Sequence, residues 1–309
     1  MNTQSDSVES PLQSTEGTPA HISPAQRMYW SVRRELWESR SIYIAPLAAA
    51  ALFLLGFLIS MIHMPEKVHA AMALDPMQQQ EFIQRPFNFA ALLIMGATFL
   101  VSIFYCLDAL HGERRDRSIL FWKSLPVSDL TTVLAKASIP LFLLPVVTFA
   151  ITVAMQCIML LIGAAAVVGS GVNAATLWSQ LGLFQMWLML FFHLLAIHGL
   201  WYAPFYGWLL LVSGWARRAA LLWASLPLFA IGIVEKIAFN TSHFSALLGY
   251  RFGGPDSGPS PSPGSMSMGY LTPLTVEKFL ISPGLWIGLA VTAAFLAAAV
   301  RLRRCQAPI

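Results

Sequence analysis

The sequence contains few charged residues. Asp, Glu, Lys and Arg make up 11% of its 309 residues, whereas hydrophobic residues make up 57%. An ordinary soluble domain has about 25% charged and about 45–50% apolar residues, so this chain lacks the polar residues that cover a water-soluble surface. The composition argues against a soluble enzyme, a nucleic-acid-binding protein and a disordered scaffold, and it predicts a membrane protein.

Cysteine is also scarce, and no motif typical of a cofactor site is present. Cys106, Cys157 and Cys305 lie far apart, without the paired spacing of a disulfide framework or a zinc site. The pattern G-x-x-x-x-G-K-S/T, which cradles nucleotide phosphates, does not occur. We therefore expect no cofactor, no bound metal, no nucleic-acid partner and no enzymatic activity in this chain.

Long stretches without charged residues predict the membrane-spanning helices. They cover residues 41–65, 86–107, 137–216, 219–234 and 279–300. A helix needs about 20 apolar residues to cross the hydrocarbon core, so the longest stretch must hold two helices, divided by the polar segment 169–173. We expect an all-α polytopic protein in which residues 41–301 form six spans, at about 42–62, 87–108, 138–168, 181–213, 219–238 and 280–300.

Lysine and arginine are distributed unevenly between the two sides of these spans. Six spans place both termini on one side, and that side receives 14 of the 19 basic residues. Because basic residues collect in cytoplasmic loops, we predict that both termini and the segment 109–136 are cytoplasmic. Residues 1–23 are expected to be a disordered tail, 251–270 a flexible outer loop and 302–309 a short cytoplasmic tail.

Residues 24–40 are predicted to form an amphipathic helix at the membrane surface. Ser23 can cap this helix, and Pro24 suits its first position. Trp30 and Trp37 lie at the boundary between its apolar and polar faces, where indole rings favour the headgroup layer. Two roles stay open for this helix: a simple anchor before the first span, or an additional contact with a cytoplasmic partner.

The segment after the second span combines dense charge with aromatic residues. The charged run His111–Arg117 is followed by Ser118-Ile-Leu-Phe-Trp122 and then by Lys123-Ser-Leu-Pro-Val-Ser128. Aromatic anchors beside arginines are typical of protein interfaces. We predict that a partner contacts Glu113, Arg114, Arg115, Arg117, Phe121, Trp122, Leu125 and Pro126. The alternative is another interfacial helix that follows the positive-inside rule.

Two short motifs flank this segment. Gly112-Glu113-Arg114 follows the second span, and Leu125-Pro126-Val127-Ser128 with Lys136 precedes the third. Together with the amphipathic start, the six spans and the cytoplasmic termini, these motifs resemble the permease subunits of type-2 ATP-binding-cassette (ABC) exporters. The resemblance implies a multi-pass protein of the bacterial inner membrane that pairs with a second permease copy or a paralogue and is driven by a cytoplasmic ATPase. A non-transporting scaffold and an intramembrane enzyme are the alternatives.

Three ionisable side chains fall within or beside the predicted spans. His193 and His198 are five residues apart on the fourth span, which separates them by about 140° on a regular α-helix. They are therefore not expected to share a metal, and we predict that each bonds to a neighbouring helix. Glu235 lies at the end of the fifth span. Because ionisable groups are costly in a membrane, these three residues are candidates for the transport pathway or its gate.

The fourth and fifth spans have unusual lengths. Residues 181–213 are too many for one straight span, and Gly199 and Pro204 allow a kink. The fifth span either ends at Glu235 or continues to about Phe239, with Glu235 partly buried. After it, the resemblance implies short re-entrant helices on the outer side, for which residues 237–250 and 271–280 are candidates.

Overall fold

A computed structural model describes residues 23–63, 75–119, 127–168, 182–253 and 276–305. All regular elements in these ranges are helical, and six helices are long and apolar enough to cross a membrane. They are Ser41–Ser60, Met77–Arg115, Asp129–Ala165, Leu183–Trp201, Ala220–Phe239 and Pro283–Cys305. The prediction of an all-α chain with six potential spans is confirmed at this level.

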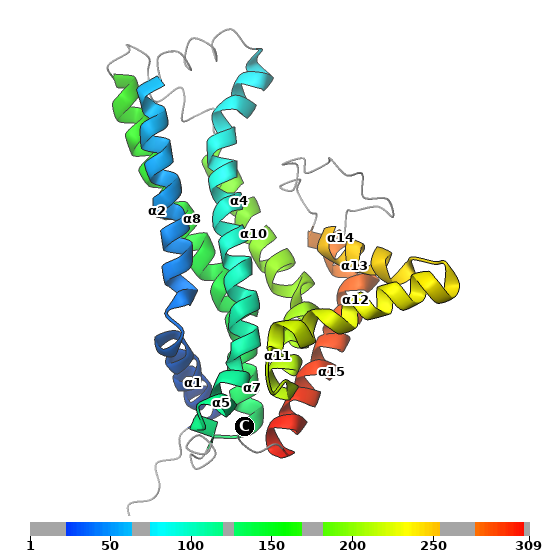
Figure 1. The fold of residues 1–309 in the computed structure, drawn as a ribbon. Coiled ribbons are helices and arrows are strands. Elements are labelled where there is room, and N and C mark those ends of the chain that lie inside the picture. Colours follow the sequence, from blue (N-terminus) through cyan, green and yellow to red (C-terminus); the bar gives the residue numbers. More distant parts are fainter. Residues whose placement is uncertain (1–22, 64–74, 120–126, 169–181, 254–275, 306–309) are drawn as a thin grey trace, which may run out of the picture.

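The long helices form an elongated bundle (Figure 1). Helix α2 (Ser41–Ser60) packs against α4 (Pro76–Ala109) and α8 (Leu144–Val168), and α4 also packs against α8. Helix α11 (Ala203–Trp215) joins α4 to the final helix, α15 (Pro283–Cys305). The short turn η1 (Met61–His63) follows α2.

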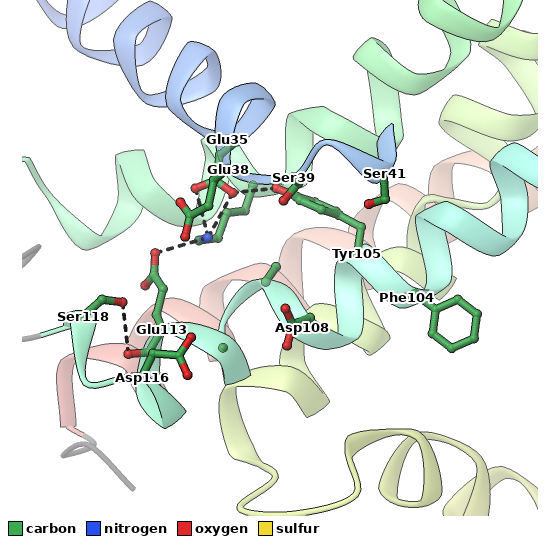
Figure 2. Close-up of a pocket in the computed structure, with 13 residues that line it drawn as sticks. Glu35, Glu38, Ser39, Ser41, Phe104, Tyr105, Asp108, Glu113, Asp116 and Ser118 are labelled. Carbon is green, nitrogen blue, oxygen red and sulfur yellow. Dashed lines mark hydrogen bonds and ion pairs between the residues drawn. The ribbon is translucent and has the colours of Figure 1, made fainter. Parts of the chain in front are cut away.

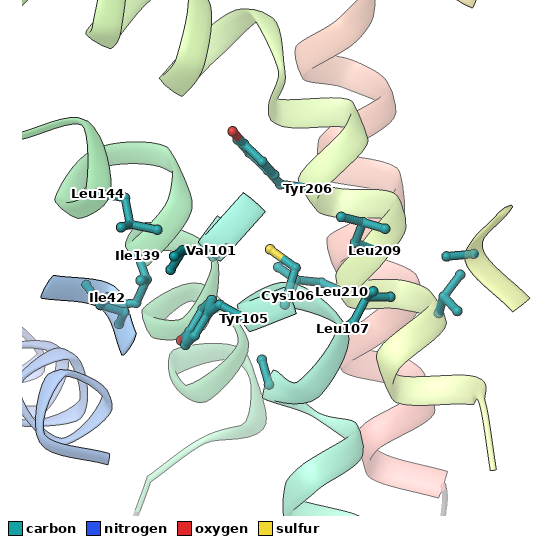
Figure 3. Packing of buried hydrophobic residues seen from close by; sticks show 14 of the residues in the cluster. Ile42, Val101, Tyr105, Cys106, Leu107, Ile139, Leu144, Tyr206, Leu209 and Leu210 are labelled. Carbon is teal, nitrogen blue, oxygen red and sulfur yellow. The ribbon is translucent and has the colours of Figure 1, made fainter. Parts of the chain in front are cut away.

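The largest buried cluster lies where these helices meet. It includes Ile42 of α2, Cys106 of α4, and Tyr206 and Leu210 of α11, all 2% exposed or less (Figure 3). Burial of one large apolar side chain contributes about 1.5–3 kcal/mol relative to exposure in water. This cluster places the ends of α4 and α11 beside each other, next to the site described below.

The third and fourth spans both contain a π-helical segment. The third consists of α7 (Asp129–Ser138), the π-helix η2 (Ile139–Leu143) and α8. The fourth consists of α10 (Leu183–His193) and the π-helix η3 (Leu194–Trp201), and its helical pattern is interrupted at Tyr202 before α11. The two π-helices contact each other. A Cβ atom at Gly199 would lie 2.5 Å from the Leu141 carbonyl oxygen, so this close approach requires glycine.

The two ends of the described chain lie at the same end of the bundle (Figure 1). Helix α1 (Pro24–Glu38) packs against α7 there, close to α5 (His111–Arg115) and to the C-terminal part of α15. The predicted cap of α1 is present: Ser23 Oγ accepts a 3.2 Å hydrogen bond from the Gln26 amide, and the Ser23 amide donates a 3.1 Å hydrogen bond to Gln26 Oε1. The second and third spans also meet at this end, as the predicted topology requires.

The fifth span leaves the bundle (Figure 1). Helix α12 (Ala220–Phe239) continues through Glu235, and Ala224 is its one buried residue. Helices α13 (His243–Gly253) and α14 (Val276–Ile281) follow before α15. The structure thus has short helices near both of the segments proposed as re-entrant, although residues 237–239 belong to α12 instead.

Candidate functional site: a buried charge cluster

Six charged side chains meet at the end of the bundle that carries both described chain ends. We call them the charge cluster: Arg34 and Glu35 of α1, Glu113 of α5, Asp129 and Lys136 of α7, and Arg303 of α15. Their formal charges balance, with three acids and three bases. Buried charges are costly unless they are paired and hydrogen-bonded. Unlike charges on the surface, these six therefore do not serve merely to keep the protein soluble.

Glu113 lies at the centre of the charge cluster. Its side chain is 4% exposed, and its Oε1 lies 3.3 Å from Arg34 Nη2 and 3.2 Å from Lys136 Nζ. Its other oxygen, Oε2, accepts a 2.5 Å hydrogen bond from Arg303 Nη1. A single carboxylate therefore joins α5 to α1, α7 and α15.

Glu35 attaches α1 to the same cluster (Figure 2). Its Oε1 lies 2.9 Å from Lys136 Nζ, and its Oε2 accepts a 2.9 Å hydrogen bond from the Tyr105 hydroxyl. Burial alone raises the pKa of the Glu35 carboxyl, but the positive charges and hydrogen bonds of Lys136 and Arg34 outweigh it, so the net pKa is lowered. Glu35 is therefore a buried anion at neutral pH.

The beginning of α7 is held at both its backbone and its side chains. Ser128 Oγ accepts a 3.1 Å hydrogen bond from the Thr131 amide, which confirms the expected N-cap. In the first turn, Asp129 Oδ1 accepts a 2.9 Å hydrogen bond from Arg303 Nε. The guanidinium of Arg303 thus bridges α7 and Glu113, and it fixes the end of the sixth span against the start of the third.

A second set of contacts fixes α5 to the end of α11. Arg114 Nη1 donates a 2.7 Å hydrogen bond to the Gly214 carbonyl oxygen. Ser213 Oγ accepts hydrogen bonds of 3.0 and 2.9 Å from the amides of Leu110 and His111. These amides lie at the junction between α4 and α5, so the side chain of α11 satisfies donors that the helix break leaves without a partner.

The predicted partner-contact residues separate into three groups. Glu113 and Arg114 are buried within this chain, where both hold α5 against the bundle, and their contact with a partner stays a prediction. Arg115 is 59% exposed, and Arg117 is also exposed, at a positive φ of 58° where the chain turns out of α5. The remaining residues of the prediction lie outside the described ranges: Phe121, Trp122, Leu125 and Pro126.

A pocket of about 390 Å³ opens beside the charge cluster (Figure 2). Its lining includes Glu35, Glu113 and Lys136 from the cluster, together with Tyr105 and the exposed Asp108. A water molecule occupies about 30 Å³ in the liquid, so several waters fit. The pocket gives solvent access to one side of an otherwise buried set of charges.

The two histidines of the fourth span lie closer than a regular α-helix allows. Their ring centroids are 6.2 Å apart, because His198 belongs to the π-helix η3, which begins directly after His193. Hydrogen bonding from i to i+5 brings residues five positions apart onto one face, and this corrects the expected separation of about 140°. The described residues contain no group of three or more His, Cys, Asp or Glu able to hold a metal ion.

Glu235 acts as a cap for the next helix. Its carboxylate accepts hydrogen bonds of 2.6 Å from the His243 amide, 2.8 Å from the Phe244 amide and 2.9 Å from the Thr241 hydroxyl. The structure therefore accounts for this carboxylate through the connection between α12 and α13. A role in a pathway or gate stays a prediction.

Arg251 fastens α13 to the rest of the bundle, away from the charge cluster. Its guanidinium lies 4.4 Å from the centre of the Trp201 ring, and its Nη1 donates a 2.9 Å hydrogen bond to the Gly284 carbonyl oxygen. The Trp201 indole in turn donates to the Arg251 carbonyl oxygen at 2.8 Å. A Cβ atom at Gly288 would lie 1.7 Å from Arg251 Nη2, so glycine makes room for this guanidinium on α15.

Sequence reasoning did not single out Glu35, Asp129 or Arg303. A signal existed for Glu35, because at 100° per residue it shares the apolar face of α1 with Met28 and Val32. The sequence carries no comparable signal for Arg303 or Asp129, because charged residues are usual at the ends of predicted spans. No family model, curated protein or solved structure matches this chain.

Proposed function

We propose that this chain is the permease subunit of an ABC exporter. It forms the translocation pathway with a second permease subunit, and a separate cytoplasmic ATPase drives it. The observation that carries the proposal is the position of Glu113, which begins the segment expected to meet the ATPase and bonds to three other helices. Such a connection suits a subunit that must convert movement of a partner into movement of its spans.

The contacts provide a continuous route from the exposed segment to the membrane. Arg115 and Arg117 are exposed at the end of α5, where a partner can reach them. Glu113 then connects α5 to α1, α7 and α15, and Arg114 connects it to α11. Because separating one buried charge from its partners costs several kcal/mol, these helices respond together when α5 is displaced.

The charge distribution supports a cytoplasmic position for this end of the bundle. The side that contains 14 of the 19 basic residues includes α1, α5 and the end of α15. An ATPase in the cytoplasm would meet the same surface. The chain has no nucleotide-binding pattern of its own, so energy for transport would come from the partner.

Co-expression and co-purification with a cytoplasmic ABC ATPase test the proposal. Trp122→Ala should weaken association by about ten- to a hundredfold, because burial of one large aromatic side chain is worth about 1.5–3 kcal/mol. Trp286→Ala is the matched control, since Trp286 is 62% exposed near the opposite end of α15. The proposal is wrong if the unmodified chain retains no ATPase after cross-linking in membranes, which is the result expected of a non-transporting scaffold.

A second variant tests the route through Glu113. Glu113→Asp keeps the charge but shortens the side chain by one methylene, so the carboxylate cannot reach Arg34, Lys136 and Arg303 at once. We expect this variant to retain the ATPase and to lose the difference in hydrolysis rate between the complex and the isolated ATPase. Normal rates in Glu113→Asp would remove the charge cluster from the coupling route.

A further inference from the structure

The outward face of α1 presents an arginine between two tryptophans. The Arg33 guanidinium carbon lies 5.1 Å from the centre of the Trp30 ring and 5.0 Å from that of the Trp37 ring. The spacing of three and four residues places the three side chains on one helical face. Trp30 is 57% exposed and Trp37 is 71% exposed, so this face is open.

Neighbouring arginines on α1 have opposite surroundings. Arg34 points into the charge cluster and pairs with Glu35 and Glu113. Arg33 has no carboxylate within ion-pair distance among the residues that the structure describes. A guanidinium stacked on indole rings uses its flat faces, while its N–H groups point outward in its plane. Arg33 is therefore a positioned cation with donors available.

The location of this face fits the surface of a membrane. Helix α1 is separated from the first span by Ser39 and Arg40 only, so it lies at the level where α2 begins. Its opposite face, with Glu35, packs against α7 and α5. Exposed tryptophans at this level favour the headgroup layer of a bilayer.

We propose that Trp30, Arg33 and Trp37 bind the headgroup of an anionic phospholipid. Arg33 donates to the phosphate oxygens, and a planar guanidinium matches a phosphate with two parallel hydrogen bonds. The two indoles lie against the glycerol and upper acyl region. Arg27 and Arg40, on the same helix and at its end, add positive charge that favours an anionic lipid over a zwitterionic one. This site does not depend on the proposed transport function.

Intact-protein mass spectrometry of the full chain tests the proposal. The purified protein is titrated with dioleoyl phosphatidylglycerol and, in parallel, with dioleoyl phosphatidylcholine. Arg33→Gln should lower phosphatidylglycerol affinity by about fivefold, the equivalent of about 1 kcal/mol for one basic residue near an anionic surface. Arg33→Lys should lose part of this affinity, because an ammonium cannot form the bidentate contact.

Arg301→Gln is the matched control, since Arg301 is an exposed arginine at the same end of the bundle. It should leave the affinity unchanged, whereas joint replacement of Trp30 and Trp37 by leucine should lower it as Arg33→Gln does. Equal losses in Arg33→Gln and Arg301→Gln would show attraction by net charge alone and overturn the site. Equal affinity of the unmodified chain for the two lipids would overturn the site as well. So would an Arg33→Gln variant that loses a cytoplasmic protein partner but keeps its affinity for phosphatidylglycerol.

Discussion

Removal of the Glu113 charge should strongly destabilise the fold. In Glu113→Gln the side chain keeps its size, but Arg34, Lys136 and Arg303 lose the anion that they share. The charge cluster then has three bases and two acids. Loss of one partner from a buried ion pair costs about 3–5 kcal/mol. We expect the full cost here, because the Glu113 side chain is only 4% exposed and water screens its charge little.

Restoring the balance of charge should recover part of this loss. Lys136→Met alone removes a base whose side chain is 3% exposed. This single variant leaves the charge cluster with one acid too many, whereas Glu113→Gln leaves it with one base too many. The double variant Glu113→Gln with Lys136→Met is again neutral overall. We therefore expect it to be more stable than the sum of the single losses indicates, by about 1–3 kcal/mol, as is found for residues in one ion-pair network.

The reactivity of a buried thiol provides the assay. Cys106 is 0% exposed, so a thiol-reactive dye reports unfolding of the bundle once Cys157 and Cys305 are replaced by serine. Glu81→Gln, at an exposed position near the other end of α4, is the control and should change stability by no more than about 0.5 kcal/mol. A similarly small change in Glu113→Gln, or strictly additive losses in the double variant, would refute the description of the charge cluster.

Two further predictions concern individual contacts, and a third concerns the topology. The stability that Glu35 contributes should be present at neutral pH, because its pKa is lower in the folded chain than the unfolded value of about 4.5. This contribution should be lost as the pH falls below 4.5 and through the folded pKa. The melting temperatures of the unmodified chain and of Glu35→Gln should therefore converge in acid. Gly288→Ala should destabilise the fold by about 1–3 kcal/mol by displacing Arg251, and Arg251→Ala in the same chain should relieve part of this strain; additive losses would contradict it. In intact cells, an impermeant maleimide should label Gly258→Cys but not Asp116→Cys, and labelling at 116 would reverse the topology.

The spans were predictable because their signal is local. A run of apolar residues such as 41–65 is long enough to cross a bilayer whatever it packs against. The caps at Ser23 and Ser128 are local for the same reason, since each bonds to an amide three residues away. Helix identity, span number and helix starts therefore follow from short stretches of sequence.

The π-helices were not predictable in this way. The π-helix η3 brings its Gly199 against the Leu141 carbonyl oxygen of η2, and neither segment has a residue pattern that requires π-helical hydrogen bonding. The 140° separation expected for His193 and His198 was wrong for this reason. A change in local hydrogen bonding, set by a distant contact, altered which side chains share a face.

The difference between local and distant interactions also explains the charge cluster. Composition and the apolar runs were sufficient to predict a helical chain with six potential spans and a charged segment after the second, because hydrophobic burial and helix capping act within a few turns of helix. The meeting of Glu113 with Arg303, 190 residues away, and of Glu35 with Lys136, 101 residues away, required the folded bundle. Ion pairs form between charges that lie within a few ångströms of each other, wherever those charges stand in the sequence. Packing of the helices alone therefore determined that Glu113 faces the interior.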